Sequence, residues 1–223
     1  MREFDALKSY PPGQPRVVGS RTIKHRLIAS ERGRDFYDGD RDCGYGGLHY
    51  DGRWAAVAQD MCAEYNLHNK ASVLQLGCDK GFLLHEFLRI NPLMRVRGTE
   101  VSIYARNHAM QDIRLGIRLL PFTAILPFKY DEFDLVIALG VVYTLNLPDA
   151  VACLREIERV GKRAFVTLGA YETEEDEKLL RSWSLLGTTF LRPEEWIEVM
   201  QYAGYRGDYK FITAKSLRLC VSS

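Results

Sequence analysis

Short apolar strands alternate with amphipathic helices along most of the chain, and this alternation constrains the fold more than any other feature. Helices are expected between the strands, the best defined being one that Asn146 caps and Gly161 ends. Parallel strands need such helical crossovers, so the pattern predicts an α/β protein with a mainly parallel sheet covered on both faces. The expected strands are 72–77, 94–100, 133–140 and 163–169, with a weaker one at 117–120.

The C-terminal part adds two helices, expected at 174–186 and 193–202, and then two short apolar segments, 209–213 and 217–221. Three residues, 214–216, separate these segments, which is too short for a parallel crossover. We therefore predict a hairpin that places one antiparallel strand in a seven-stranded sheet.

Length and composition predict one domain. The chain has 223 residues, of which 47% are hydrophobic, enough for a single large core. Residues 54–223 carry the regular pattern, whereas residues 1–53 are rich in Gly, Pro, Arg and Tyr and are expected to form an N-terminal arm and lid.

Charge and cysteine content narrow the classes of partner. Lys plus Arg total 30 and Asp plus Glu total 29, so the balance gives no reason to expect a nucleic acid or an anionic membrane and favours a small or neutral ligand. The five cysteines show no metal-binding spacing, and several lie in apolar runs, which predicts reduced thiols and no metal. No signal peptide or long apolar run is evident, so we expect a soluble, cytoplasmic protein.

A glycine turn follows the first regular strand in the segment VLQLGCDKGF, residues 73–82. Backbone N–H groups in such a strand-to-helix turn favour a nucleotide-like ligand. The dinucleotide fingerprint G-x-G-x-x-G would need glycine at 77, 79 and 82, but the chain has Gly77, Asp79 and Phe82, which disfavours an NAD-dependent oxidoreductase. The alternative is a tight turn that binds nothing.

This turn, followed about twenty residues later by an acid, resembles motif I and the second-strand acid of the class I, S-adenosylmethionine-dependent methyltransferases. The usual family turn is D/E-x-G-x-G-x-G, which the chain matches at Gly77 and Gly81, with Gln75 at the first acid and Asp79 at the middle glycine. Residues 133–160 resemble the family's fourth strand, the loop after it and the next helix. The resemblance implies a Rossmann-like methyltransferase sandwich with S-adenosylmethionine as cofactor and S-adenosylhomocysteine as product.

The resemblance also implies a cofactor site around the glycine turn and the ends of the neighbouring strands. Glu100 would accept hydrogen bonds from the ribose hydroxyls, and Phe122 would pack on the adenine. Because Gln75 and Asp79 depart from the family pattern, a degenerate, non-catalytic fold that acts as a binding or scaffold protein is the alternative. The expected cofactor-binding residues are Tyr45, Gly77, Cys78, Asp79, Gly81, Glu100, Val101, Phe122 and Leu139.

Residues 37–54, YDGDRDCGYGGLHYDGRW, resemble a segment that precedes the fold in small bacterial methyltransferases associated with surface-polysaccharide or related biosynthetic gene sets. This resemblance implies a sugar or surface-polysaccharide precursor as the acceptor. The glycines would let the segment close over a ligand, with Tyr45 and Tyr50 as walls. The alternative is an ordered structural loop.

Methyl transfer from a sulfonium is an in-line displacement that depends mainly on positioning. For a hydroxyl acceptor a general base is needed, and His49, Asp51 and Tyr143 are the candidates; for an amine, shape and desolvation suffice. Asp51 and Arg53 are equally interpretable as surface partners of each other. The sequence ALGVVYTL after the fourth strand lacks an N/D-P-P-Y/F/W motif, which favours a small-molecule acceptor over a nucleic acid. A homodimer is left open.

Overall fold

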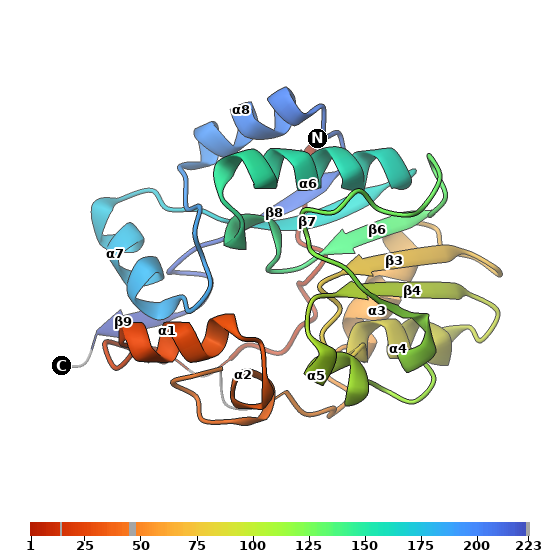
Figure 1. Ribbon diagram of the computed structural model, residues 1–223. Coiled ribbons are helices and arrows are strands. Elements are labelled where there is room, and N and C mark those ends of the chain that lie inside the picture. Colours follow the sequence, from red (N-terminus) through yellow and green to blue (C-terminus); the bar gives the residue numbers. More distant parts are fainter. Residues whose placement is uncertain (14, 45–47, 222–223) are drawn as a thin grey trace.

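The computed structural model describes residues 1–13, 15–44 and 48–221 (Figure 1). Its main sheet has seven strands in the order β1-β8-β7-β6-β3-β4-β5. These strands are β1 Arg2–Glu3, β3 Ser72–Leu76, β4 Arg95–Glu100, β5 Ile117–Leu119, β6 Leu135–Ala138, β7 Ala164–Gly169 and β8 Asp208–Ile212. The expected mainly parallel, seven-stranded sheet is therefore confirmed.

Helices cover both faces of this sheet, as Figure 1 shows. On one face α6 (Leu147–Val160) and α8 (Pro193–Ala203) pack on the side chains of alternate strand residues. On the other face α3 (Ala55–Glu64) and α4 (Phe82–Ile90) bury a second apolar cluster. The shorter helices are α5 Ile103–Asn107, η1 Arg114–Gly116 and η2 Val142–Thr144.

Helix α6 is stabilised by features of its own sequence, a capping residue and an apolar stripe. The side chain of Asn146 accepts a hydrogen bond from the Asp149 amide at 3.0 Å, which satisfies a free donor of the first turn. Its apolar stripe is buried, and Leu154 and Ile157 within it are fully so. The helix ends before Gly161, as expected.

The C-terminal hairpin prediction is wrong. Strand β8 pairs in parallel with β7 and with β1, and β9 (Leu219–Val221) leaves this sheet to pair in parallel with β2 (Arg16–Val18). Because β1 takes the free edge of β8, that edge offers β9 no place. Mutual hydrogen bonds between Thr213 and Ser216 hold a turn that redirects the chain. Every strand pairing in the described part of the chain is parallel.

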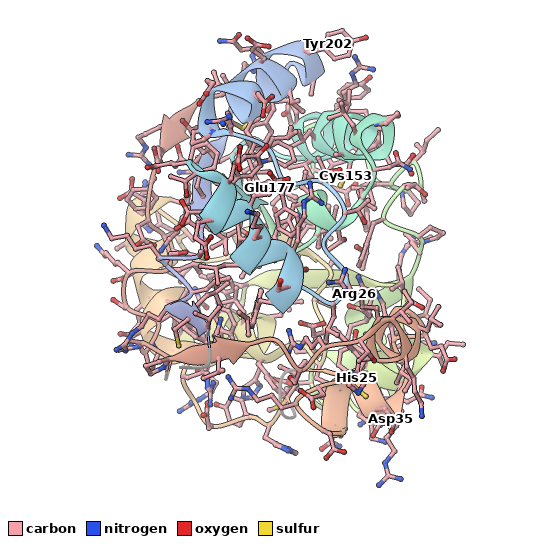
Figure 2. The ribbon with its side chains drawn as sticks, turned by 90° about the vertical axis from the view of Figure 1, so that its left-hand side faces the viewer. His25, Arg26, Asp35, Cys153, Glu177 and Tyr202 are labelled. Carbon is pink, nitrogen blue, oxygen red and sulfur yellow. The ribbon has the colours of Figure 1, made fainter. Side chains whose placement is uncertain are left out.

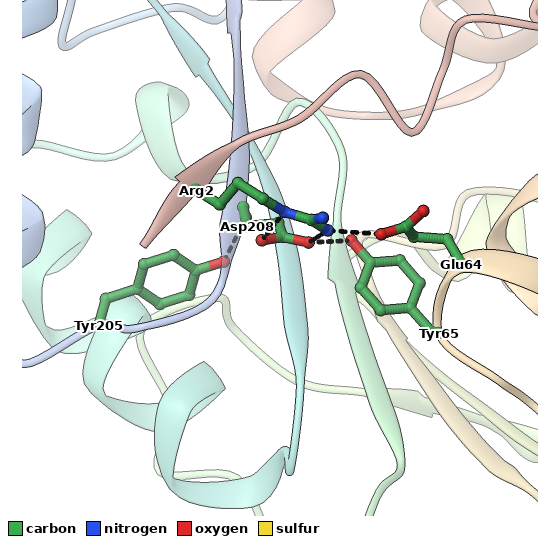
Figure 3. A network of polar contacts seen from close by, with 5 residues as sticks. All are labelled: Arg2, Glu64, Tyr65, Tyr205 and Asp208. Carbon is green, nitrogen blue, oxygen red and sulfur yellow. Dashed lines mark hydrogen bonds and ion pairs between the residues drawn. The ribbon is translucent and has the colours of Figure 1, made fainter.

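Polar contacts hold β1 against the sheet (Figure 3). The Arg2 guanidinium donates to both carboxylate oxygens of Asp208, at 2.6 and 3.1 Å, and to Glu64 at 2.7 Å. The hydroxyls of Tyr65 and Tyr205 donate to the carboxylate and the backbone carbonyl of Asp208. The first residues of the expected arm are thus a strand of the main sheet.

The rest of the N-terminal region, residues 16–44 and 48–53, is called the N-terminal cap below. It contains α1 (Ile23–Ser30) and α2 (Arg34–Asp38). Both helices lie at the side of the molecule toward which β3 and β6 point in Figure 1, close to α7 (Glu174–Trp183). Arg26 of α1, labelled in Figure 2, lies on the same side of the molecule as α7. It donates to the carbonyl of Arg181 near the end of that helix. Within the described residues, no helix has the length and apolar character needed to cross a membrane.

Candidate functional site

The turn after β3 has the backbone geometry that its glycines predict. Gly77, Asp79 and Gly81 have φ angles of 60°, 50° and 78°, all in the left-handed region. A Cβ on Gly77 would lie 2.6 Å from Val141, and a Cβ on Gly81 would lie 2.7 Å from Ile113. The glycines therefore let the turn pack tightly against its neighbours, and the space beside Gly81 is filled by Ile113.

Glu100, at the carboxyl end of β4, is fully buried and its carboxylate joins three segments. One oxygen accepts from the amides of Val101 (2.8 Å) and Ser102 (3.0 Å) and from the Tyr37 hydroxyl (3.2 Å). The other accepts from the Asp79 amide at 2.9 Å. In this conformation the carboxylate is buried and hydrogen-bonded, so a ribose contact requires its surroundings, Tyr37 among them, to rearrange.

Asp79 has an unusual electrostatic environment. Burial and the nearby Glu100 carboxylate raise the pKa of Asp79 to about 7, although Arg32 opposes the shift. The Arg32 guanidinium lies over the rings of Phe122 and Phe36, at 5.2 and 5.7 Å from their centroids. A bound cation beside Asp79 would favour its ionised form.

Gln75, in the middle of β3, has a buried acceptor without a partner and lines a small cavity. Its Oε1 is buried, and no group in the described part of the chain donates a hydrogen bond to it. The cavity has a volume of about 230 Å³, and Cys78, Asp79 and Phe82 also line it. Buried acceptors are usually paired, so this oxygen marks a place for a donor on a ligand or on a water molecule.

A larger cavity of about 450 Å³ lies over the carboxyl ends of β3 and β6. Gly77 and Gly140 form part of its floor, Tyr143 comes from the loop after β6, and the cap supplies much of the remaining wall. Asp79, Leu48 and Arg53 line both cavities, so the two are adjacent. Ligands of open parallel sheets bind at this edge.

The structure brings most of the expected site residues to these cavities. Gly81, Glu100 and Val101 line neither of the two, and Tyr45 lies outside the described residues. Those in the larger cavity are Gly77, Asp79, Phe122, Leu139 and Tyr143, and those in the smaller one are His49, Asp51, Cys78 and Asp79.

The candidate bases differ in their surroundings. Asp51 pairs with Arg53, whose hydrogen bonds lower the pKa of Asp51 to about 2, so Asp51 is a weak base near neutral pH. The interpretation of these two residues as surface partners is confirmed. His49 is exposed. The ring of Tyr143 lies 5.8 Å from that of Phe190.

The surroundings of Cys78 disfavour a nucleophilic thiolate. It is buried, and burial raises the pKa of its thiol well above the ordinary value. The described residues contain no group of three or more His, Cys, Asp or Glu side chains arranged to hold a metal ion.

Sequence reasoning missed two sets of residues. Lys80 is 6% exposed and bonds Asp38 at 2.5 Å and the Leu48 carbonyl at 3.0 Å, which fastens the cap to the glycine turn. The second set consists of four arginines of the cap that line the larger cavity, and they lie in segments without apolar periodicity that could have indicated them. These arginines are Arg16, Arg21, Arg32 and Arg41.

Comparisons with known proteins agree with this architecture. A family model described as a methyltransferase domain matches residues 74–164. The structure of YcgJ from Bacillus subtilis is similar with a TM-score of 0.52 and 18% identity, covering 66% of each chain. A proposed methyltransferase from Bacillus halodurans gives 0.51 at 15% identity, covering 66% of this chain and 68% of its own.

The structure of SpnF, a [4+2]-cyclase, covers 86% of this chain and 75% of its own, with a TM-score of 0.55 and 15% identity. A search of curated protein sequences found no match. At these identities the solved structures establish the fold, which is Rossmann-like and of the methyltransferase type.

Proposed function

We propose that the chain binds S-adenosylmethionine and transfers its methyl group to an oxygen or nitrogen atom of a small molecule. The observation that carries the proposal is the unpaired, buried Oε1 of Gln75, a residue that lines a cavity beside the left-handed glycine turn. In the family pattern this position holds an acid that faces the ammonium group of the cofactor. A neutral amide oxygen still accepts a hydrogen bond from an ammonium.

The residues that line the two cavities offer partners for the methionine half and for the adenine of the cofactor. Gln75 and Asp79 offer acceptors for the ammonium group, and Phe122 offers a ring for the adenine beside Leu139. Glu100 would reach the ribose hydroxyls after a local rearrangement that displaces the Tyr37 hydroxyl. When bound, the cofactor supplies an electrophilic methyl carbon, and the chain needs only to hold the acceptor in line and exclude water.

The base for a hydroxyl acceptor is proposed to be His49 or Tyr143. Both line a cavity at the carboxyl edge of the sheet. Asp51 is a weaker candidate because Arg53 lowers its pKa. A sugar or surface-polysaccharide precursor is the proposed acceptor, on the resemblance of residues 37–54. A cytoplasmic location and a homodimer also stay predictions.

A second function is supported by a specific contact. The Tyr37 hydroxyl and three backbone amides occupy the carboxylate of Glu100, which favours a non-catalytic fold that acts as a binding or scaffold protein. The cyclase SpnF illustrates that proteins of this fold need not be described as methyltransferases.

Calorimetric titration of the purified chain with S-adenosylhomocysteine tests the proposal. We expect one saturable site that S-adenosylmethionine competes for and NAD does not. Absence of binding contradicts the proposed function. Binding together with no transfer of labelled methyl to any acceptor in a panel of hydroxyl and amine sugars, free and phosphorylated, supports the non-catalytic alternative.

A further inference from the structure

The larger cavity is far more positive than the chain as a whole. The formal net charge of the whole chain is +1, yet five arginines line this cavity: Arg16, Arg21, Arg32, Arg41 and Arg53. Among the described residues that line it, Asp79 is the one acid, and its raised pKa leaves it partly neutral near pH 7. Positive charge gathered in a cleft attracts an anion more strongly than the net charge suggests.

Two of these guanidinium groups are held in place by an aromatic ring. Those of Arg16 and Arg21 lie 5.3 and 5.6 Å from the ring of Trp183, at the end of α7. Arg21 also donates to the carbonyl of Trp183 and, at 3.0 Å, to the carbonyl of Arg41. Guanidinium groups fixed in this way lose little further freedom when they bind a ligand.

Several of these arginines also have a role within the fold. Arg21 satisfies a carbonyl at the C-terminal end of α7, where a cation is favourable. Arg53 pairs with Asp51, and Arg32 stacks on Phe122. These contacts explain part of the positive charge without a ligand.

Arg41 is not explained in this way. It is exposed, and the ion pairs found in the described ranges do not include it. Together with Arg16 and Arg21 it lines both the larger cavity and a neighbouring one of about 280 Å³. Asp42, an acid that lines the neighbouring cavity, accepts a hydrogen bond from Ser20 at 2.7 Å.

We propose that Arg16, Arg21 and Arg41 bind a phosphate or diphosphate group of the acceptor. A carboxylate has two oxygens, and one or two arginine guanidinium groups fill their hydrogen-bonding positions. A phosphate ester has more acceptor oxygens and can bind several arginines at once. That the bound molecule is the methyl acceptor rests on the proposed function, but the anion site itself does not. The acceptor is therefore a phosphorylated small molecule, with its reacting atom toward Gly77 and Leu139 in the same cavity.

Calorimetric titration with inorganic pyrophosphate at low ionic strength tests the site. We expect saturable binding that weakens as salt is added, because Coulomb attraction to exposed guanidinium groups is screened. Arg41→Gln should weaken pyrophosphate binding about tenfold, since one charge-assisted contact is lost. The matched control is Arg95→Gln, which makes the same change of charge at the exposed amino end of β4 and should leave binding unchanged.

Three results overturn the proposal: no pyrophosphate binding by the unaltered chain, an equal loss in both variants, or tighter binding of citrate than of pyrophosphate, which assigns the site to carboxylates. Titration with S-adenosylhomocysteine is run in parallel. Pyrophosphate binding that depends on Arg41, without binding of S-adenosylhomocysteine, supports the anion site and contradicts the proposed function.

Discussion

At the scale of single residues, a substitution of Gln75 tests ligand binding with less disturbance of the fold than a substitution of any glycine of the turn. Gly77 and Gly81 have positive φ angles and neighbours within 3 Å of a Cβ, so substitution there strains the fold whether or not a ligand binds. Gln75, in contrast, is 6% exposed with an acceptor that lacks a donor. Its replacement removes no hydrogen bond of that oxygen within the described protein.

We therefore predict that Gln75→Leu weakens binding of S-adenosylhomocysteine about tenfold, the value of one hydrogen bond to a charged group. The free energy of unfolding should stay the same or rise, because a buried unpaired acceptor is lost. Gln75→Glu should strengthen binding, since an anion then faces the ammonium. Calorimetry and urea unfolding measure both quantities, and an unchanged affinity in Gln75→Leu would place the ammonium elsewhere.

Asp79 gives a prediction about pH. Burial beside Glu100 raises its pKa from the ordinary value of 3.8 to about 7. Below pH 3.8 the proton is bound in both the folded and unfolded chains; as pH rises toward 7 the unfolded chain releases it first, so stability falls. Above the pKa that Asp79 has in the folded chain, this loss of stability stays constant.

Asp79→Asn removes this cost, and asparagine tolerates the φ of 50° at this position. We expect the variant to melt at a higher temperature than the unaltered chain at pH 8, with the difference shrinking toward pH 4. Thermal unfolding at several pH values checks it. A difference that does not depend on pH would show that ionisation of Asp79 is not its cause.

At the scale of elements, one buried ion pair fastens α2 to the turn after β3. The side chains of Lys80 and Asp38 are 7% and 18% exposed, and Tyr104 also donates to Asp38 at 2.8 Å. Removing one partner of a buried pair leaves a charge without compensation, which typically costs about 3–5 kcal/mol. The pair thus controls how firmly the N-terminal cap is docked.

Asp38→Asn should lower the melting temperature by several degrees and speed amide exchange in α2, while exchange in β3 stays slow. The double variant Asp38→Asn, Lys80→Met should recover part of the loss, since the unpaired charge is gone. Asp51→Asn is the control in the same cap, because its pair with Arg53 is exposed. Equal effects of Asp38→Asn and Asp51→Asn would contradict a docking role for the buried pair.

The elements that the sequence predicts well are those with local causes. Helix α6 has its cap at Asn146 and its stripe of buried residues, and strands β3 and β6 are apolar runs next to turns. Strand β1 has two residues, and its place depends on Arg2 contacting Asp208, which is 206 positions away. No local pattern carries such a contact, and the same holds for the pairing of β2 with β9.

The candidate site divides in the same way. The glycine turn is a local motif, so Gly77 and Asp79 could be expected at the cavity from their spacing alone. Tyr37 reaches Glu100 across 63 positions, and Arg41 approaches Arg16 only through the folding of an irregular segment. The net charge also gave no sign of this arginine cluster, because acids elsewhere in the chain balance its charge.

At the scale of the whole molecule, segments from both ends of the chain are joined by parallel pairing. Strand β1 covers the edge of β8, and β2 pairs with β9 beside the cap. The Phe4 amide continues the first pairing by donating to the Tyr209 carbonyl at 2.9 Å. We therefore expect the chain to unfold as one cooperative unit rather than as an arm and a separate domain.

Deletion of residues 1–4 tests this expectation, because it removes β1 and leaves the backbone groups at the edge of β8 unpaired. We predict a lower melting temperature and a tendency to associate through the exposed edge, measured by calorimetry and light scattering. Arg2→Gln keeps the strand and removes its ion pairs; as the Arg2 side chain is 54% exposed, its melting temperature should fall by less than about 4 °C. If this substitution alone reproduced the full effect of the deletion, the side-chain contacts of Figure 3 rather than strand pairing would hold this end of the chain.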